Sequence, residues 1–212
     1  MIAQRAWRLA ALAVVLVGVW SLAGWLISAG GGQPVADQFI FDRVQAATGD
    51  VMVTAARIVT LGGDPYLAPV AVAGLAAFIW FRTRSWEFLV MATVALGGSA
   101  VVASTVKLIV DRPRPDDGLV ETMTSAFPSG HSVRGVVVFG LLAWWVATAT
   151  RWAWRRVLAA VCVILAGGVV VSRVMLGVHW PSDVLAGAVL GVVWLAATLQ
   201  WGRPRATDLR DG

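Results

Sequence analysis

Residues 172–183 read Ser-Arg-Val-Met-Leu-Gly-Val-His-Trp-Pro-Ser-Asp and separate two apolar segments of the chain. Pro181 suits the first position of a helix, because its missing N–H would have no helical partner there. The last apolar segment is therefore predicted to begin as a helix at about this residue. Ionisable side chains are costly at membrane depth, so the arginine, histidine and aspartate at this junction are candidates for a functional site.

The spacing of these residues predicts an anion site. His179 lies beside a helix N-terminus, where unpaired N–H groups favour bound anions, and Asp183 falls in the first helical turn. If the turn curls back, Asp183 accepts a hydrogen bond from His179 Nδ1, which leaves Nε2 bare and nucleophilic. Arg173 precedes this histidine by six residues and can pair with phosphoryl oxygens. An arginine, an oriented histidine and a carboxylate around an anion site suggest phosphoryl transfer.

The composition is that of an integral membrane protein. Hydrophobic residues make up 58% of the 212 residues and charged residues only 14%, far more apolar than a soluble domain of this length needs. The net charge of +5 comes from basic residues scattered over short loops, which argues against a nucleic-acid partner. The single cysteine, Cys162, lies in an apolar run, so we expect it to be buried and expect no intramolecular disulfide.

The hydrophobic runs predict an all-α fold, an integral membrane bundle of six transmembrane helices. The first run, Leu9–Ile27, has 19 residues and follows two arginines. A cleaved signal peptide is the alternative, although its apolar region is usually shorter, about 7 to 15 residues. The other five predicted spans are residues 67–81, 88–106, 133–148, 157–171 and 184–200.

The segment between the first two spans, residues 31–65, is more polar. It contains two short amphipathic pieces, Asp37–Ala47 and Val51–Leu61, which are predicted to be short helices at the membrane interface. A solvent-exposed connector is the alternative.

Basic residues in the loops predict the orientation of the bundle. With six helices, ten of the seventeen lysines and arginines fall on the side of the N-terminus. Positively charged loops favour the cytoplasm, so both termini are predicted to be cytoplasmic. The loops over residues 107–132 and 172–183 then share the extracytoplasmic side.

Two further polar stretches are predicted on that side. Residues 107–115 read Lys-Leu-Ile-Val-Asp-Arg-Pro-Arg-Pro, with Lys107 at the end of a span and Arg114 held extended by flanking prolines. Residues 127–131 read Phe-Pro-Ser-Gly-His and offer a hydroxyl, a backbone N–H that can approach an oxyanion, and the second histidine of the chain. Two histidines at helix ends on one side, among three cations, favour a catalytic site over buried core histidines.

Together these residues resemble the three-part signature of the type 2 phosphatidic acid phosphatases, the PAP2 superfamily. The parts are Lys107-x6-Arg114-Pro115, Pro128-Ser129-Gly130-His131 and Ser172-Arg173-x5-His179-x3-Asp183, and they occur in this order. The resemblance covers about residues 107–191 in its motifs. It implies a single membrane phosphatase domain over residues 1–212, with the catalytic motifs within 107–183.

The resemblance also implies a role for each motif residue. His179 would be the nucleophile that forms a phosphohistidine, Asp183 would orient it, and His131 would protonate the leaving oxygen. The phosphoryl oxygens would be bound by Lys107, Arg114, Ser129, Gly130 and Arg173. Three fixed cations would neutralise the developing charge, so no metal and no other cofactor is expected.

Arg134 lies just inside the fourth predicted span, where a charge is costly. We expect it to contact the second phosphate of a diphosphate or a lipid headgroup; snorkelling to the interface is the alternative. The acidic residues of the first loop are expected to be solvated or to pair with Arg112. They are Asp111, Asp116, Asp117 and Glu121.

The expected function is that of a multi-pass cell-membrane lipid phosphatase with its site at the outer leaflet. Undecaprenyl diphosphate is the favoured substrate, and phosphatidylglycerophosphate and phosphatidate are the alternatives, because an apolar entrance discriminates lipid tails weakly. A phosphotransferase that passes the phosphoryl group to another alcohol also stays open. The expected partners are the lipid phosphate substrate and membrane lipids, and no oligomeric state is predicted.

Overall fold

Helices account for all the regular structure in the computed structural model, which describes residues 2–29, 33–84, 86–116, 118–119, 124–149 and 153–201. The elements are α1 (Ile2–Ser28), α2 (Val35–Ala47), α3 (Asp50–Val59), the 3-10 helix η1 (Thr60–Gly63), α4 (Leu67–Thr83), α5 (Glu87–Val110), α6 (Gly130–Ala149), α7 (Arg155–Met175) and α8 (Pro181–Trp201). The all-α prediction is confirmed, and α8 begins at Pro181 as expected.

These helices provide five to six candidate membrane spans. Five of them, α1, α5, α6, α7 and α8, are long and apolar enough to cross a membrane alone. Residues 50–63 and 67–82 also pass the same test as a pair, with a bend of 53° between them. The predicted membrane bundle is confirmed with five to six candidate spans, and the predicted span over residues 67–81 reaches that number only together with α3 and η1.

Local chemistry explains the bend between η1 and α4. Asp64 Oδ1 accepts hydrogen bonds from the N–H groups of Tyr66 and Leu67, at 2.8 and 2.9 Å, and so satisfies two free donors at the start of α4. Pro65 has no N–H to offer a continuing helix. The chain therefore starts a new helix here instead of extending η1.

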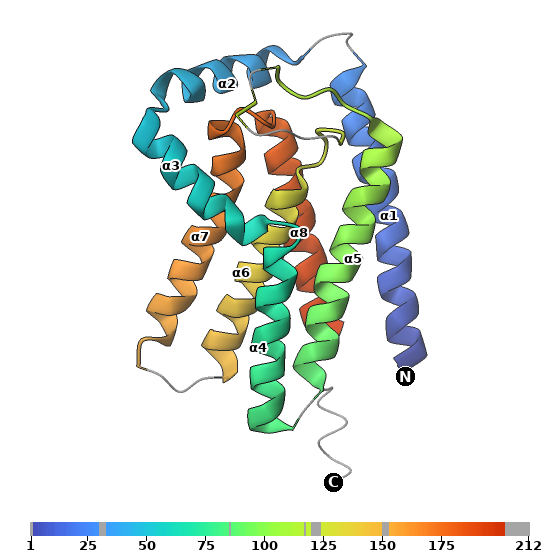
Figure 1. Cartoon of the computed structure of the whole chain (residues 1–212). Coiled ribbons are helices and arrows are strands. Elements are labelled where there is room, and N and C mark those ends of the chain that lie inside the picture. Colours follow the sequence, from blue (N-terminus) through green and yellow to red (C-terminus); the bar gives the residue numbers. More distant parts are fainter. Residues whose placement is uncertain are drawn as a thin grey trace.

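The two short helices after α1, α2 and α3, differ from each other in their direction relative to the bundle. α2 runs across the end of the bundle, as the amphipathic pattern predicts, whereas α3 slopes down from it towards the bundle centre (Figure 1). At the foot of this slope, a Cβ on Gly63 would lie only 2.5 Å from the carbonyl oxygen of His131. A glycine is needed for this approach, which brings η1 against the start of α6.

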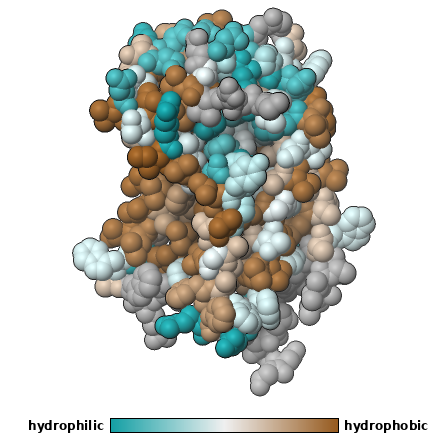
Figure 2. Space-filling model, viewed as in Figure 1, coloured by the Kyte–Doolittle hydropathy of each residue, from teal (hydrophilic) through white to brown (hydrophobic). Residues whose placement is uncertain are grey.

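The surface divides into polar and apolar zones. Hydrophilic residues gather at the end of the molecule crossed by α2, and a broad hydrophobic zone lies below them (Figure 2). The N-terminus lies at the opposite end of the bundle (Figure 1). This arrangement is typical of a membrane bundle whose polar site opens at one surface.

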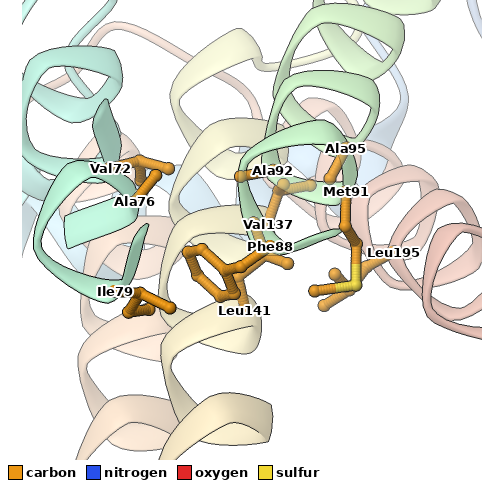
Figure 3. Close-up of a cluster of buried hydrophobic side chains, with 10 residues drawn as sticks. All are labelled: Val72, Ala76, Ile79, Phe88, Met91, Ala92, Ala95, Val137, Leu141 and Leu195. Carbon is orange, nitrogen blue, oxygen red and sulfur yellow. The ribbon is translucent and has the colours of Figure 1, made fainter. Parts of the chain in front are cut away.

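A hydrophobic core holds the bundle together. Side chains from α4, α5, α6 and α8 meet there, with Phe88 of α5 beside Leu141 of α6 and Met91 of α5 beside Leu195 of α8 (Figure 3). Ala92 and Ala95 keep the contacts close because small side chains let helix backbones approach. The packed helices give the polar helix ends a fixed frame.

Candidate active site

The residues singled out by the sequence come together at one end of the bundle. Lys107 lies in the last turn of α5, His131 in the first turn of α6, Arg173 in the last turn of α7, and Asp183 in the first turn of α8. The loop after α5 reaches the segment before α8, since Arg114 Nη1 lies 3.1 Å from His179 Nε2. The prediction that both loops share one side of the bundle is therefore confirmed.

Arg114 sets the tautomer of His179. A guanidinium can donate hydrogen bonds but cannot accept one, so the nitrogen facing it, Nε2, is the bare acceptor. Nδ1 then carries the proton and faces the carboxylate of Asp183. The sequence predicts the same tautomer, but from a hydrogen bond between Nδ1 and Asp183.

The guanidinium of Arg114 is held in place by backbone carbonyls. It donates to the carbonyl oxygens of Val178 and Thr124, each at 2.7 Å, from Nη1 and Nε respectively. These bonds tie the first loop to the segment just before α8. These contacts hold the cation against His179.

The predicted hydrogen bond between His179 and Asp183 is not formed. Nδ1 lies 3.5 Å from Asp183 Oδ2, longer than a normal hydrogen bond, and it has no other partner among the described residues. The carboxylate is held elsewhere: Oδ2 accepts from Trp180 N at 2.9 Å and Oδ1 accepts from Arg112 Nη1 at 2.6 Å. The bond to Trp180 is half of a capping box at the start of α8.

Burial and neighbouring cations set the protonation of His179. Burial lowers its pKa well below 6.5, and the positive charges of Arg114, Lys107 and Arg173 lower it further. Burial also lowers the pKa of Arg114, against an opposing effect of Asp183, but an arginine stays cationic. The site therefore holds a neutral imidazole among fixed positive charges at neutral pH.

Several donors face the same region. The hydroxyl of Ser129 and Nε of Arg173 are buried and have no hydrogen-bond partner within the described ranges. Arg173 is steadied by a 2.8 Å bond from Nη1 to the hydroxyl of Thr60 in η1. Lys107 donates from Nζ to the carbonyl of Ser125. Buried donors of this kind suit the oxygens of a bound phosphoryl group.

The loop that carries Ser129 packs directly on α8. The backbone N–H of Ser129 donates to the carbonyl of Asp183 at 3.0 Å. A Cβ on Gly187, one helical turn further, would lie 2.6 Å from the carbonyl oxygen of Ser129. The absence of a side chain at this position lets the loop and the helix approach closely.

His131 and Arg134 lie on the neighbouring side of the site. His131 is half-buried and is near enough to interact electrostatically with Arg173, Arg134 and His179. Arg134 donates from Nε to the carbonyl of Gly63 at 2.9 Å. A Cβ on Gly130 would lie 3.3 Å from Arg134 Nη1, so this guanidinium lies beside the predicted oxyanion glycine.

Comparison with known families assigns the chain. The model of the PAP2 superfamily matches residues 86–206, which include all three motifs. The chain belongs to the PAP2 superfamily. Membership identifies it as a multi-pass membrane hydrolase that acts on phosphate esters.

Two relatives and one solved structure illustrate what this PAP2 chain is similar to. Phosphatidylglycerophosphatase B of Bacillus subtilis is 32% identical over 142 residues, 64% of this chain and 68% of the relative. Decaprenylphosphoryl-5-phosphoribose phosphatase of Mycobacterium tuberculosis is 29% identical over 182 residues, 82% of this chain and 96% of the relative.

The solved structure is a transmembrane PAP2 type phosphatidylglycerolphosphate phosphatase from Bacillus subtilis, with a TM-score of 0.78 and 23% identity. The match covers 89% of this chain and 94% of that structure. At this identity the likeness concerns the fold, and it agrees with the bundle described above.

Some residues of the PAP2 site did not stand out in the sequence. Arg112 is only 2% exposed and pairs with Asp37 and Asp183. The acidic loop residues were expected to be solvated or to pair with Arg112. Of those residues, Asp111 and Asp116 are exposed, and the other two lie outside the described ranges. Thr60 was missed because η1 has no polar motif. The pattern Arg-Pro-Arg-Pro was the one available signal for Arg112.

Proposed function

We propose that this PAP2 protein hydrolyses a lipid phosphate through a phosphohistidine formed on His179, without a metal. The contact between Arg114 Nη1 and His179 Nε2, at 3.1 Å, carries the proposal. It joins a bare ring nitrogen to a guanidinium suited to binding phosphoryl oxygens. A substrate phosphoryl group entering this contact would meet a nucleophile and a fixed cation together.

In the first step, Nε2 of His179 attacks the terminal phosphorus, and the bond from this phosphorus to the leaving oxygen breaks. The leaving oxygen is the lipid oxygen of a monophosphate or the bridging oxygen of a diphosphate, which leaves as the lipid monophosphate. Arg114 then donates its hydrogen bond to a phosphoryl oxygen in place of Nε2. The remaining oxygens are bound by Lys107, Arg173, the Ser129 hydroxyl and the Gly130 N–H. Charge neutralisation and positioning of this kind are the main contributions to phosphoryl transfer.

His131 completes the chemistry as acid and then as base. It gives its proton to the leaving oxygen, and in the second step it takes a proton from the water that attacks the phosphohistidine. Inorganic phosphate leaves and His179 is free again. The carboxylate of Asp183 stabilises the positive charge that the ring of His179 carries in the intermediate.

The proposed substrate is a lipid with its phosphate at the headgroup level, on the extracytoplasmic side, with both termini of the chain in the cytoplasm. Undecaprenyl diphosphate is proposed first. Two observations support this: Arg134 adds a fourth cation beside Gly130, and the Mycobacterium tuberculosis relative is named for a decaprenyl lipid. Phosphatidylglycerophosphate, for which the Bacillus subtilis relative is named, and phosphatidate are the competing substrates.

Phosphate release by purified protein in detergent with EDTA tests the proposal. We expect release from undecaprenyl diphosphate to be fastest among the three lipids and to disappear in His179→Ala. An acceptor alcohol added in a parallel series should leave free phosphate unchanged. Diversion of the phosphoryl group to that alcohol would indicate a transferase, and release that persists in His179→Ala would exclude the phosphohistidine.

Arg134 offers a test of the diphosphate preference. We expect Arg134→Ala to lower kcat/KM for the diphosphate lipid about tenfold more than for the monophosphate lipids, because a charge-assisted contact contributes on the order of 1.5 kcal/mol. Arg57→Ala, an exposed arginine on α3, is the control. An equal loss for both lipid classes would remove Arg134 from substrate selection.

A further inference from the structure

A buried arginine links the catalytic helix to the helix that crosses the end of the bundle. Arg112 donates from Nη1 to Asp183 Oδ1 at 2.6 Å and from Nη2 to Asp37 Oδ2 at 2.7 Å. Its side chain is 1% exposed, and those of Asp37 and Asp183 are 6% and 0% exposed. The three charges are therefore shielded from water and interact strongly.

Asp37 also binds the N-terminus of α8, although it belongs to α2. Its Oδ1 accepts the backbone N–H of Ser182 at 2.8 Å, and its Oδ2 accepts the hydroxyl of the same residue at 2.5 Å. That hydroxyl in turn accepts a 2.7 Å bond from Arg112. Asp37 thus caps α8 from another element and holds both Ser182 and the arginine.

The charges in this group have a consequence for His179. Arg112 alone would cancel the negative charge of Asp183, the carboxylate that faces His179 Nδ1 at 3.5 Å. With Asp37 included, two carboxylates and one guanidinium leave the group with one net negative charge. A negative charge beside His179 favours the cationic ring of a phosphohistidine, which would otherwise form among three positive side chains.

We propose that Asp37 and Arg112 are positioning residues that hold the carboxylate of Asp183 towards His179 and leave the three charged groups together with one net negative charge. Arg112 fixes Oδ1, which leaves Oδ2 facing the histidine ring, and Asp37 balances the charge of Arg112. Helix α2 is then part of the catalytic apparatus and not only a surface helix. This inference rests on the phosphohistidine function proposed above.

The test compares Asp37→Asn with Asp42→Asn, which removes the same charge from an exposed position of the same helix. We expect Asp37→Asn to lower kcat by about 10- to 100-fold with KM changed by less than about threefold, since the loss concerns the transition state. Asp42→Asn should match the wild type in both constants. Asp37→Glu, which restores the charge, should recover part of kcat.

A second control separates positioning from the docking of α2. Gln45 Nε2 donates to the carbonyl of Val174 at 2.6 Å and so attaches α2 to α7 away from Arg112. Gln45→Ala should lower the thermal midpoint while kcat stays within about twofold of the wild type. An equal fall of kcat in Gln45→Ala and Asp37→Asn would overturn the inference, because loosening α2 would then be sufficient.

Ser182→Ala covers the case in which Asp37→Asn does not fold. It removes only the hydroxyl shared by Asp37 and Arg112, and we expect kcat to fall about tenfold. A kcat within twofold of the wild type in Ser182→Ala, or in folded Asp37→Asn, would overturn the inference and leave the proposed function intact. A wild type that releases no phosphate from any of the three lipids would overturn both.

Discussion

His179 lies between a guanidinium on one ring nitrogen and a carboxylate on the other. Arg114 faces Nε2 at 3.1 Å, and Asp183 faces Nδ1 at 3.5 Å. The donor-only chemistry of arginine places the ring proton on Nδ1, and burial keeps the ring neutral. At the residue scale, the contact with Arg114 sets the tautomer of the proposed nucleophile, and burial sets its charge state.

Replacement of Arg114 by lysine should strongly lower activity, although the positive charge is kept. An ammonium cannot bond the carbonyls of Val178 and Thr124 while facing His179, as the guanidinium does. We expect kcat/KM for the lipid phosphate to fall by about 100- to 1000-fold. Arg43→Lys, at an exposed position of α2, should stay within twofold. Steady-state phosphate release measures both, and a small effect at Arg114 would argue against its role at phosphorus.

The depressed pKa of His179 predicts a particular pH dependence. The ring stays neutral well below pH 6.5, so kcat/KM should show no loss of activity centred near 6.5 that belongs to this residue. Below that pH the unfolded chain binds a proton that the folded chain does not, so the free energy of unfolding falls as the pH falls. The thermal midpoint of the wild type should therefore drop more between about pH 7 and pH 5 than that of His179→Asn. Equal drops would indicate an ordinary histidine.

At the scale of elements, the site depends on how closely helix ends approach one another. The loop carrying Ser129 lies against α8 at Gly187, and η1 lies against α6 at Gly63. Each approach sets the position of polar groups in the site, and at Gly63 the carbonyl also accepts a hydrogen bond from Arg134 of α6. Small residues at helix contacts serve this purpose in membrane bundles.

Gly187→Ala should therefore impair both packing and activity. The new Cβ would lie 2.6 Å from the Ser129 carbonyl oxygen, so the loop must move, at a cost of about 1 to 3 kcal/mol. We expect a lower thermal midpoint and at least a tenfold loss of kcat, because Ser129 and Gly130 move together. Gly167→Ala in α7 is the matched control, since nothing lies within 4 Å of its added Cβ. Similar behaviour of the two variants would show that the close approach is unimportant.

At the scale of the whole molecule, the polar end of the bundle and its apolar sides fix how the protein sits in a membrane. The start of α1 and the end of α8 both lie at the end of the bundle opposite the candidate active site (Figure 1). The arginines near the start of α1 and the end of α4 lie at that same end. This arrangement makes the orientation open to a direct test.

Single cysteines at Asp116 and Arg84 test this topology in a Cys162→Ala background. Both positions are exposed, and Cys162 itself is buried, as its apolar surroundings predicted. We expect a membrane-impermeant thiol reagent to label the cysteine at position 116 in intact cells and the cysteine at position 84 only after lysis. Labelling of both positions in intact cells would contradict the six-span orientation.

The sequence by itself determined the class of fold, the approximate spans, the start of α8 and the residues gathered at the site. These features depend on local properties: apolar runs long enough for a bilayer, the preference of proline for a helix start, and motif residues at fixed spacing. The same local view cut the helices short. Hydropathy ends at the first polar residue, whereas helical hydrogen bonding continues through Lys107, His131 and Arg173.

Only the tertiary structure decided which side chains pair. Arg112 and Asp37 are 75 positions apart, and no local pattern relates α2 to the loop after α5. The slope of α3, the bond between Thr60 and Arg173, and the missing hydrogen bond between His179 and Asp183 have the same origin. Each depends on where the packed helices bury a polar group and on which partner then lies within hydrogen-bond reach. A buried charge needs a partner, and only the packing of the helices determines which one is near.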